Sequence, residues 1–141
     1  MGWFEKRHDR EARVVKYSFV IQSEDQLEWL KAFPESEVVL YHSTWSREGG
    51  LAESEVVKIA EKAEKQGRCV CLQFDRLIED QHFANYLETC LSYPSSWMLR
   101  VQDLGLANSL SEQKRDFQLV LEAGHANQQA ISIWRELLGP S

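Results

Sequence analysis

The sequence predicts an α/β domain built on a parallel β-sheet. Two apolar runs, 97–101 and 117–121, lead into the polar clusters 102–105 and 122–127, and a segment of helical period follows each. Short apolar runs that end in acidic residues and Gly, alternating with helices, are typical of βα units. The chain upstream repeats this pattern without hairpin turns of the Asn-Gly type. The sequence therefore predicts parallel strands joined by crossover helices.

Length and charge limit the class of protein. With 141 residues the chain fits one domain, expected over 14–141 after a charged N-terminal arm over 1–13. The net charge of −6 and the lack of a long basic run argue against a dedicated nucleic-acid surface, while local RNA contact stays open. No apolar run is long enough to span a membrane and no secretory signal is present, so a cytoplasmic location is expected.

Five βα units are expected in chain order. The strands are predicted at 14–21, 38–41, 69–74, 97–101 and 117–121, and the helices from directly after Ser23 to 33, at 52–66, 79–92 and 106–113, and from near 127 to 138. Ser23 and Gln26 form a capping box at the start of the first helix, which ends before Pro34. Gly67 ends the second helix.

Apolar residues at helical spacing predict which faces are buried. The expected stripes are Leu27, Leu30 and Phe33; then Val56, Ile59, Ala60 and Ala63; then Phe83, Leu87, Cys90 and Leu91; and finally Ile131, Trp134 and Leu137 or Leu138. Trp29 and Trp97 also fall on apolar stripes and are expected in the core.

The three cysteines, Cys69, Cys71 and Cys90, suit a reducing compartment. Cys69 and Cys71 share one face of a strand, which is the wrong geometry for a mutual disulfide. The two cysteines have no neighbouring His and no second Cys-x-Cys pair, so the pattern does not favour a metal site. We expect small core side chains and no bound metal.

Two architectures fit five parallel βα units. A flavodoxin-like doubly wound sheet closes as an independent domain at this length. The first five-eighths of a (β/α)₈ barrel has the same alternation but does not close. Periodicity does not distinguish them.

Several segments resemble, in order, the N-terminal half of the collagenase-like peptidases, peptidase family thirty-two of the unassigned catalytic type. The most specific is Val101-Gln102-Asp103-Leu104-Gly105-Leu106. The others are 38–41 (VVLY), 46–51 (SREGGL), 60–70 (AEKAEKQGRCV) and 121–127 (LEAGHAN) before a helix that contains Trp134. The resemblance covers about 17–139 and implies a partial (β/α)₈ barrel.

The resemblance also has departures. Several relatives carry an iron–sulfur cluster, used to insert oxygen into RNA bases or a quinone precursor, on cysteines downstream of every segment present here. The three cysteines of this chain do not match those positions, so no cofactor is expected. The family's Asn after the third strand is replaced by the segment 73–75, and its Ser-Thr-Gln after the fifth strand reads Leu121-Glu122-Ala123. The isolated chain is expected to be inactive.

Candidate catalytic residues follow the last two strands. Asp103 and Glu122 end neighbouring strands, so their carboxylates can meet at one rim and divide acid and base roles. His125 can act there as a general base. The alternative is structural: Asp103 caps the next helix, and Glu122 pairs with Arg47 or Arg100.

Candidate substrate-binding residues lie mainly in the polar loop after the second strand. They are His42, Ser46, Arg47, Gly49, Gly50 and, before the last helix, Asn127. Two glycines before a helix can expose amides to an anion, and Arg47 offers a planar fork for carboxylate or phosphate. The loop can also be an ordinary connection, and Asn127 an ordinary helix cap.

Two functional hypotheses follow. The first is a collagenase-like peptidase-family protein, a relative of peptidases and of RNA- or quinone-modifying enzymes, whose rim binds substrate. The second is a non-catalytic assembly module, because a partial barrel exposes strand edges that a second copy or another chain must cover. It predicts a homodimer or a partner chain.

Overall fold

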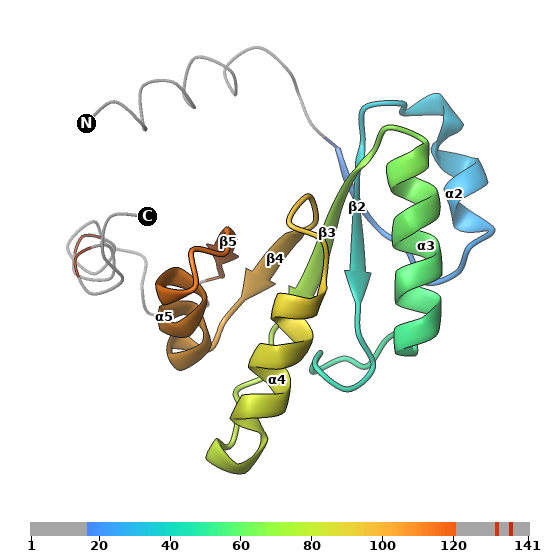
Figure 1. The fold of residues 1–141 in the computed structure, drawn as a ribbon. Coiled ribbons are helices and arrows are strands. Elements are labelled where there is room, and N and C mark those ends of the chain that lie inside the picture. Colours follow the sequence, from blue (N-terminus) through green and yellow to red (C-terminus); the bar gives the residue numbers. More distant parts are fainter. Residues whose placement is uncertain (1–16, 121–131, 133–135, 137–141) are drawn as a thin grey trace.

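The computed structural model describes residues 17–120 together with Ser132 and Glu136, and these alternate between strands and helices (Figure 1). The elements are β1 (Ser18–Val20), α2 (Gln26–Trp29), the 3-10 helix η1 (Leu30–Ala32), β2 (Glu37–Tyr41), α3 (Glu53–Lys65), β3 (Cys69–Phe74), α4 (Asp80–Ser92), β4 (Met98–Val101), α5 (Leu104–Glu112) and β5 (Phe117–Leu119). The predicted α/β class is confirmed. The arm over 1–13, the start of the first predicted strand and the stripe of the last helix lie outside the described residues.

The five strands form one parallel sheet in the order β1-β2-β3-β4-β5. Each crossover therefore moves one strand further in the same direction, and the order of the described strands never reverses. The strands' C-terminal ends share one edge of the sheet, and their N-terminal ends share the other.

Helices pack on one face of this sheet. A single buried cluster joins alternate strand residues to helix residues: Val38, Leu40, Val70, Leu72, Phe74, Leu99 and Val101 from strands; Leu27, Leu30, Val56, Ile59, Ala60, Ala63, Tyr86, Cys90, Leu106, Ala107 and Leu110 from helices. The predicted stripe of α3 is confirmed. Full burial of an aliphatic side chain such as Leu contributes ~1.5–3 kcal/mol, so this cluster is the main source of stability.

The opposite face of the sheet carries a polar network. Glu37 Oε1 accepts hydrogen bonds from Ser18 Oγ at 2.9 Å and from Arg100 Nη2 at 2.6 Å, and Arg100 Nε donates to Gln118 Oε1 at 2.9 Å. These bonds link β1, β2, β4 and β5. The Cys71 thiol of β3 is fully buried. Arg100 lowers its pKa and Glu37 raises it, but burial is the largest effect and raises the pKa to about 12.

Two buried arginines hold the edge of the sheet where the strands begin. Arg68, just before β3, donates to the carbonyls of Leu30 (2.7 Å) and Phe33 (2.6 Å), which lead into β2. Arg115, before β5, donates to the carbonyls of Pro94, Ser95 and Trp97, which lead into β4, at 2.7–3.1 Å. In each case the planar guanidinium donates to several carbonyls of the segment that leads into the neighbouring strand, and so ties that segment to its own strand.

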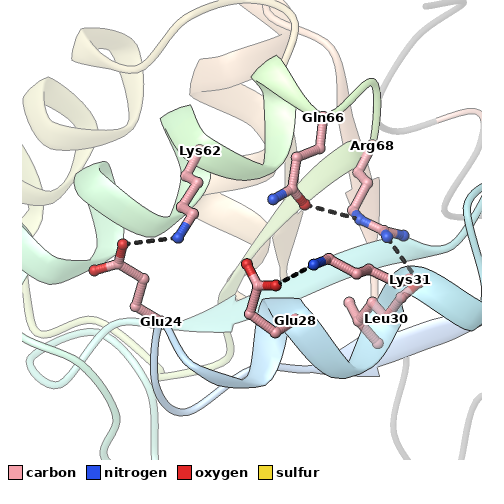
Figure 2. A network of polar contacts seen from close by, with 7 residues as sticks. All are labelled: Glu24, Glu28, Leu30, Lys31, Lys62, Gln66 and Arg68. Carbon is pink, nitrogen blue, oxygen red and sulfur yellow. Dashed lines mark hydrogen bonds and ion pairs between the residues drawn. The ribbon is translucent and has the colours of Figure 1, made fainter.

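Figure 2 shows Arg68 beside the contacts that join α3 to the segment before β2. Glu24 pairs with Lys62 at 3.0 Å and with Lys58 at 2.8 Å, whereas Lys31 pairs with Glu28 within its own segment at 2.6 Å. Solvent-accessible ion pairs of this kind add little to stability, because water screens the two charges. The buried guanidinium is therefore the stronger connection.

The start of the first helix differs from the prediction. The Gln26 side chain accepts from the Gln22 amide at 2.6 Å, and no side chain caps α2. Asp25, the N-cap residue, has helical dihedral angles (φ −60°, ψ −29°). A capping box would require the Gln26 side chain to accept from the Ser23 amide and not from that of Gln22, so the predicted Ser23–Gln26 box is wrong.

The outer face of the first helix was also predicted wrongly. Leu27 and Leu30 are buried as expected, but Phe33 is exposed and Trp29 is 71% exposed. The α-helix ends after four residues and continues as η1 with about 3.0 residues per turn, so the apolar stripe does not continue along one line. Trp97, in contrast, is buried as predicted.

The buried stripe of α4 is Tyr86 and Cys90, a spacing of one helical turn. Phe83 and Leu87 are partly buried, and the prediction of a buried Leu91 is wrong because it is exposed. Tyr86 is buried instead: its ring contacts Trp45 and Phe74, and its hydroxyl donates to the Trp45 carbonyl at 3.1 Å. A core position for Cys69 is also wrong, since it is exposed at the start of β3.

Candidate functional site

The loop between β2 and α3, residues 42–52 and hereafter the β2–α3 loop, closes back onto the end of β2. His42 and Leu51 form an isolated parallel bridge, in which the Ser43 amide donates to Leu51 O at 2.9 Å and the Leu51 amide donates to Tyr41 O at 2.8 Å. Inside the loop the amides of Trp45 and Ser46 donate to His42 O at 3.2 and 2.9 Å. The loop is therefore a closed structure at the C-terminal edge of the sheet.

The two glycines allow this closure. Gly49 has φ +76° and its amide donates to Ser46 O at 3.3 Å. Gly50 has φ +156°, and a Cβ there would collide with the carbonyl of Tyr41, its carbon only 2.6 Å away. Both positions thus need glycine for geometry. An anion-binding role for the pair stays a prediction, and the Gly49 amide already has a partner.

His42 lies at the base of this loop and is only 6% exposed. Its Nδ1 accepts a hydrogen bond from the Thr44 amide at 3.1 Å, and its ring stacks on Trp45 with centroids 6.0 Å apart. Its Nε2 and the buried Oγ of Ser46 have no hydrogen-bond partner within the described ranges. Burial lowers the pKa of His42, and the negative field of Glu53 only partly opposes that shift.

The segment after β3 fixes the loop from the side. Asp75 Oδ1 accepts from the Arg47 amide at 2.8 Å, Arg76 Nη1 donates to Thr44 O at 2.9 Å, and the Arg76 amide donates to Trp45 O at 3.3 Å. Asp75 is buried. No role was predicted for Asp75 from the sequence, although an acidic residue directly after a buried strand was an available signal.

Asp103 has a structural role at the end of β4. Its Oδ1 accepts from the Leu106 amide at 2.9 Å and caps α5, and its Oδ2 accepts from the Ile78 amide at 3.2 Å. The capping alternative for Asp103 is therefore confirmed. This cap also explains why α5 begins at Leu104, two residues before the predicted start.

The predicted site residues fall into three groups. The β2–α3 loop brings together His42, Ser46, Arg47, Gly49 and Gly50, of which Arg47 is exposed. Asp103 lies on the same edge, tied to the segment before α4. Glu122, His125 and Asn127 lie outside the described residues. The proposed pairing of Asp103 with Glu122 stays a prediction.

The described residues offer limited means of holding a metal or an anion. No group of three or more His, Cys, Asp or Glu side chains is arranged for metal binding in that part of the chain. Burial raises the pKa of Cys71 and Cys90 to about 12, which disfavours the thiolate that binds metals. Acidic residues occupy the first turns of α3 (Glu53, Glu55) and α4 (Asp80), which disfavours anions at these termini.

Comparisons with protein-family models, with curated proteins and with solved structures found no match. Among the helices in the described ranges, none combines the length and apolar character needed to cross a membrane.

Proposed function

We propose that this chain forms the N-terminal part of a (β/α)₈-type barrel of the collagenase-like peptidase family, with a substrate-binding rim at the C-terminal ends of its strands. The proposal extends the resemblance of the segment 101–106 and its neighbours. We expect no hydrolysis by the isolated chain, because five βα units do not close an eight-stranded barrel.

The observation that carries this proposal is the strand order. Barrels add each parallel strand beside the previous one, and their helices form a single outer layer. The order β1-β2-β3-β4-β5, with the helices of the range 17–120 packed on one face, agrees with that pattern. A flavodoxin-like sheet has the order 2-1-3-4-5 and helices on both faces.

The position of the most specific segment also supports the proposal. Residues 101–106 span the end of β4 and the first turn of α5, on the edge that carries the β2–α3 loop. Barrel proteins keep their binding groups on the loops at that edge. Arg47 and Gly50 are exposed among the predicted binding residues in the described ranges, and Arg47 offers a charged side chain there.

Binding of denatured collagen peptides to the full chain tests this function. Arg47→Gln should weaken binding about tenfold or more, as loss of a charge-assisted contact would. Lys31→Gln, on η1, is the matched control and should bind like wild type. Equal effects of the two substitutions, or no binding by wild type, would contradict a peptide-binding rim.

A second candidate function is assembly with another copy of the chain. Among the described strands, β1 and β5 each pair on one side only. Tyr17, before β1, is 53% exposed and lies in an aromatic cluster with Phe19 and Phe33, whose ring centroids are 5.2–6.3 Å apart. A twofold axis along the strands would place β5 of one copy beside β1 of the other. Exposed apolar strand edges of this kind favour such pairing.

A further inference from the structure

His42 is held as the neutral tautomer that is protonated at Nε2. Its Nδ1 accepts from the Thr44 amide at 3.1 Å, and a nitrogen that accepts a hydrogen bond carries no proton. The proton of the neutral ring is therefore at Nε2, which is buried and without a partner in the described ranges. This arrangement fits neutral imidazole only.

Protonation would break this arrangement at two places. A second proton at Nδ1 would point at the Thr44 N–H, so an acceptor would become a donor that faces another donor. The new positive charge would also be buried against Trp45, away from water. Both effects oppose the closed loop and leave an open loop unaffected.

The backbone of the same residue closes the loop. The His42 carbonyl accepts the amides of both Trp45 and Ser46, and its bridge to Leu51 joins the two ends of the loop. Displacement of the ring therefore disturbs the turn over 42–46 and the closure at Leu51 together. The β2–α3 loop as a whole contains five of the six predicted substrate-binding residues.

We propose that His42 is a pH-sensitive switch for the β2–α3 loop, which is closed while the imidazole is neutral and opens when it is protonated. The switch does not depend on the proposed peptide-binding function. It predicts that the C-terminal edge of the sheet becomes more accessible in mildly acidic conditions.

Charged groups on the surrounding elements set the pH range. The start of α3 provides Glu53, the segment after β3 provides Asp75 and Arg76, α4 provides the Tyr86 hydroxyl, and the loop itself provides Arg47 and Glu48. Glu53 favours protonation of His42, but burial outweighs it, so the pKa of the closed state lies below the ordinary value of about 6.5. Protons then bind the open state preferentially, and opening is favoured as pH falls below about 6.5.

Amide hydrogen exchange of the ¹⁵N-labelled full chain tests the switch. Between pH 7.5 and 5.5 the protection factors of the Thr44 and Ser46 amides should fall at least about threefold in wild type. His42→Asn keeps an acceptor near Nδ1 but does not titrate, so its protection factors should stay constant. His82→Asn, which changes an exposed histidine on α4, is the matched control and should behave like wild type.

The same fall in protection in His42→Asn would overturn the proposal. If that variant does not fold, ring ¹⁵N shifts of wild type provide a separate test. They should show a proton at Nε2 and none at Nδ1 at pH 7.5, and ring protonation should coincide with loss of Thr44 protection. A ring that titrates while Thr44 and Ser46 stay protected would also overturn it.

Discussion

Arg100 of β4 donates to Glu37 of β2 at 2.6 Å although β3 lies between their strands. In the register of the sheet, Arg100 is level with Gln73 and Tyr41, whereas Glu37 is level with Cys69. The long guanidinium side chain therefore extends across β3 and toward the N-terminal ends of the strands. With side chains 23% and 18% exposed, the two residues form a largely desolvated pair on the sheet face opposite α3, α4 and α5.

Loss of this ion pair should destabilise the fold. Arg100→Met leaves the Glu37 carboxylate partly buried without its cation, which should lower the free energy of unfolding by ~1–3 kcal/mol. Urea unfolding measures the change. Lys31→Met breaks the solvent-exposed pair with Glu28 and should change the free energy of unfolding much less. Equal costs for the two variants would contradict a structural role for the Arg100–Glu37 pair.

Replacement of Arg68 or Arg115, the two buried arginines, by lysine should destabilise the fold. A lysine at position 68 keeps the charge but cannot reach the carbonyls of Leu30 and Phe33 with a planar fork. Arg68→Lys and Arg115→Lys should each lower the free energy of unfolding by ~2–4 kcal/mol, measured in urea. Arg76→Lys, at an exposed arginine, is the control. If Arg76→Lys lowered the free energy of unfolding as much as Arg68→Lys and Arg115→Lys do, burial of the guanidinium would not explain the effect.

The adjacent glycines should differ in their tolerance of alanine. Gly49→Ala places a Cβ in open space at φ +76° and should cost about 1–2 kcal/mol from backbone conformation alone. Gly50→Ala adds a collision with the Tyr41 carbonyl and should cost more than about 3 kcal/mol. Thermal unfolding of both variants checks this order. The reverse order would mean that the loop does not close on β2 as described.

Glu64 should contribute to the pH dependence of stability. Hydrogen bonds from Ser96 Oγ (2.5 Å) and Trp97 Nε1 (3.1 Å) lower the pKa of its carboxyl below the ordinary value of 4.5. The stabilisation is therefore present above pH 4.5 and is lost as pH falls through the lower folded-state pKa. Urea midpoints at pH 6 and at acidic pH should differ less in Glu64→Gln than in wild type. Glu61→Gln, on the same helix, should retain the wild-type difference.

Local sequence patterns predicted the parts of the fold that depend on local chemistry. The stripe of α3 follows directly from helical spacing, and the bounds of β3 follow from an apolar run that begins after Gly67 and Arg68. The polar loop after β2 was also predictable, since polar residues and two glycines follow a buried strand. A helix cap was the structural alternative to a catalytic role for Asp103. Its side chain accepts from the Leu106 amide, as such a cap requires.

Other features depend on contacts between distant segments. Trp29 is exposed because α2 ends early and continues as η1, which helical spacing does not predict. The Arg100–Glu37 pair depends on the register of three strands, and the burial of Tyr86 depends on a carbonyl in the β2–α3 loop. The Nδ1 acceptor role of His42 likewise follows from the path of the loop. No local pattern contains this information.

The mass of the purified chain in solution tests the central proposal, a partial barrel, most directly. Light scattering across a concentration series should detect a dimer of the 16.4 kDa chain, because a partial barrel leaves strand edges that a second copy can cover. Val20→Lys at the β1 edge should weaken the dimer, whereas Leu91→Lys on α4 should not. A compact monomer at every concentration would contradict the partial barrel and the family function proposed from it.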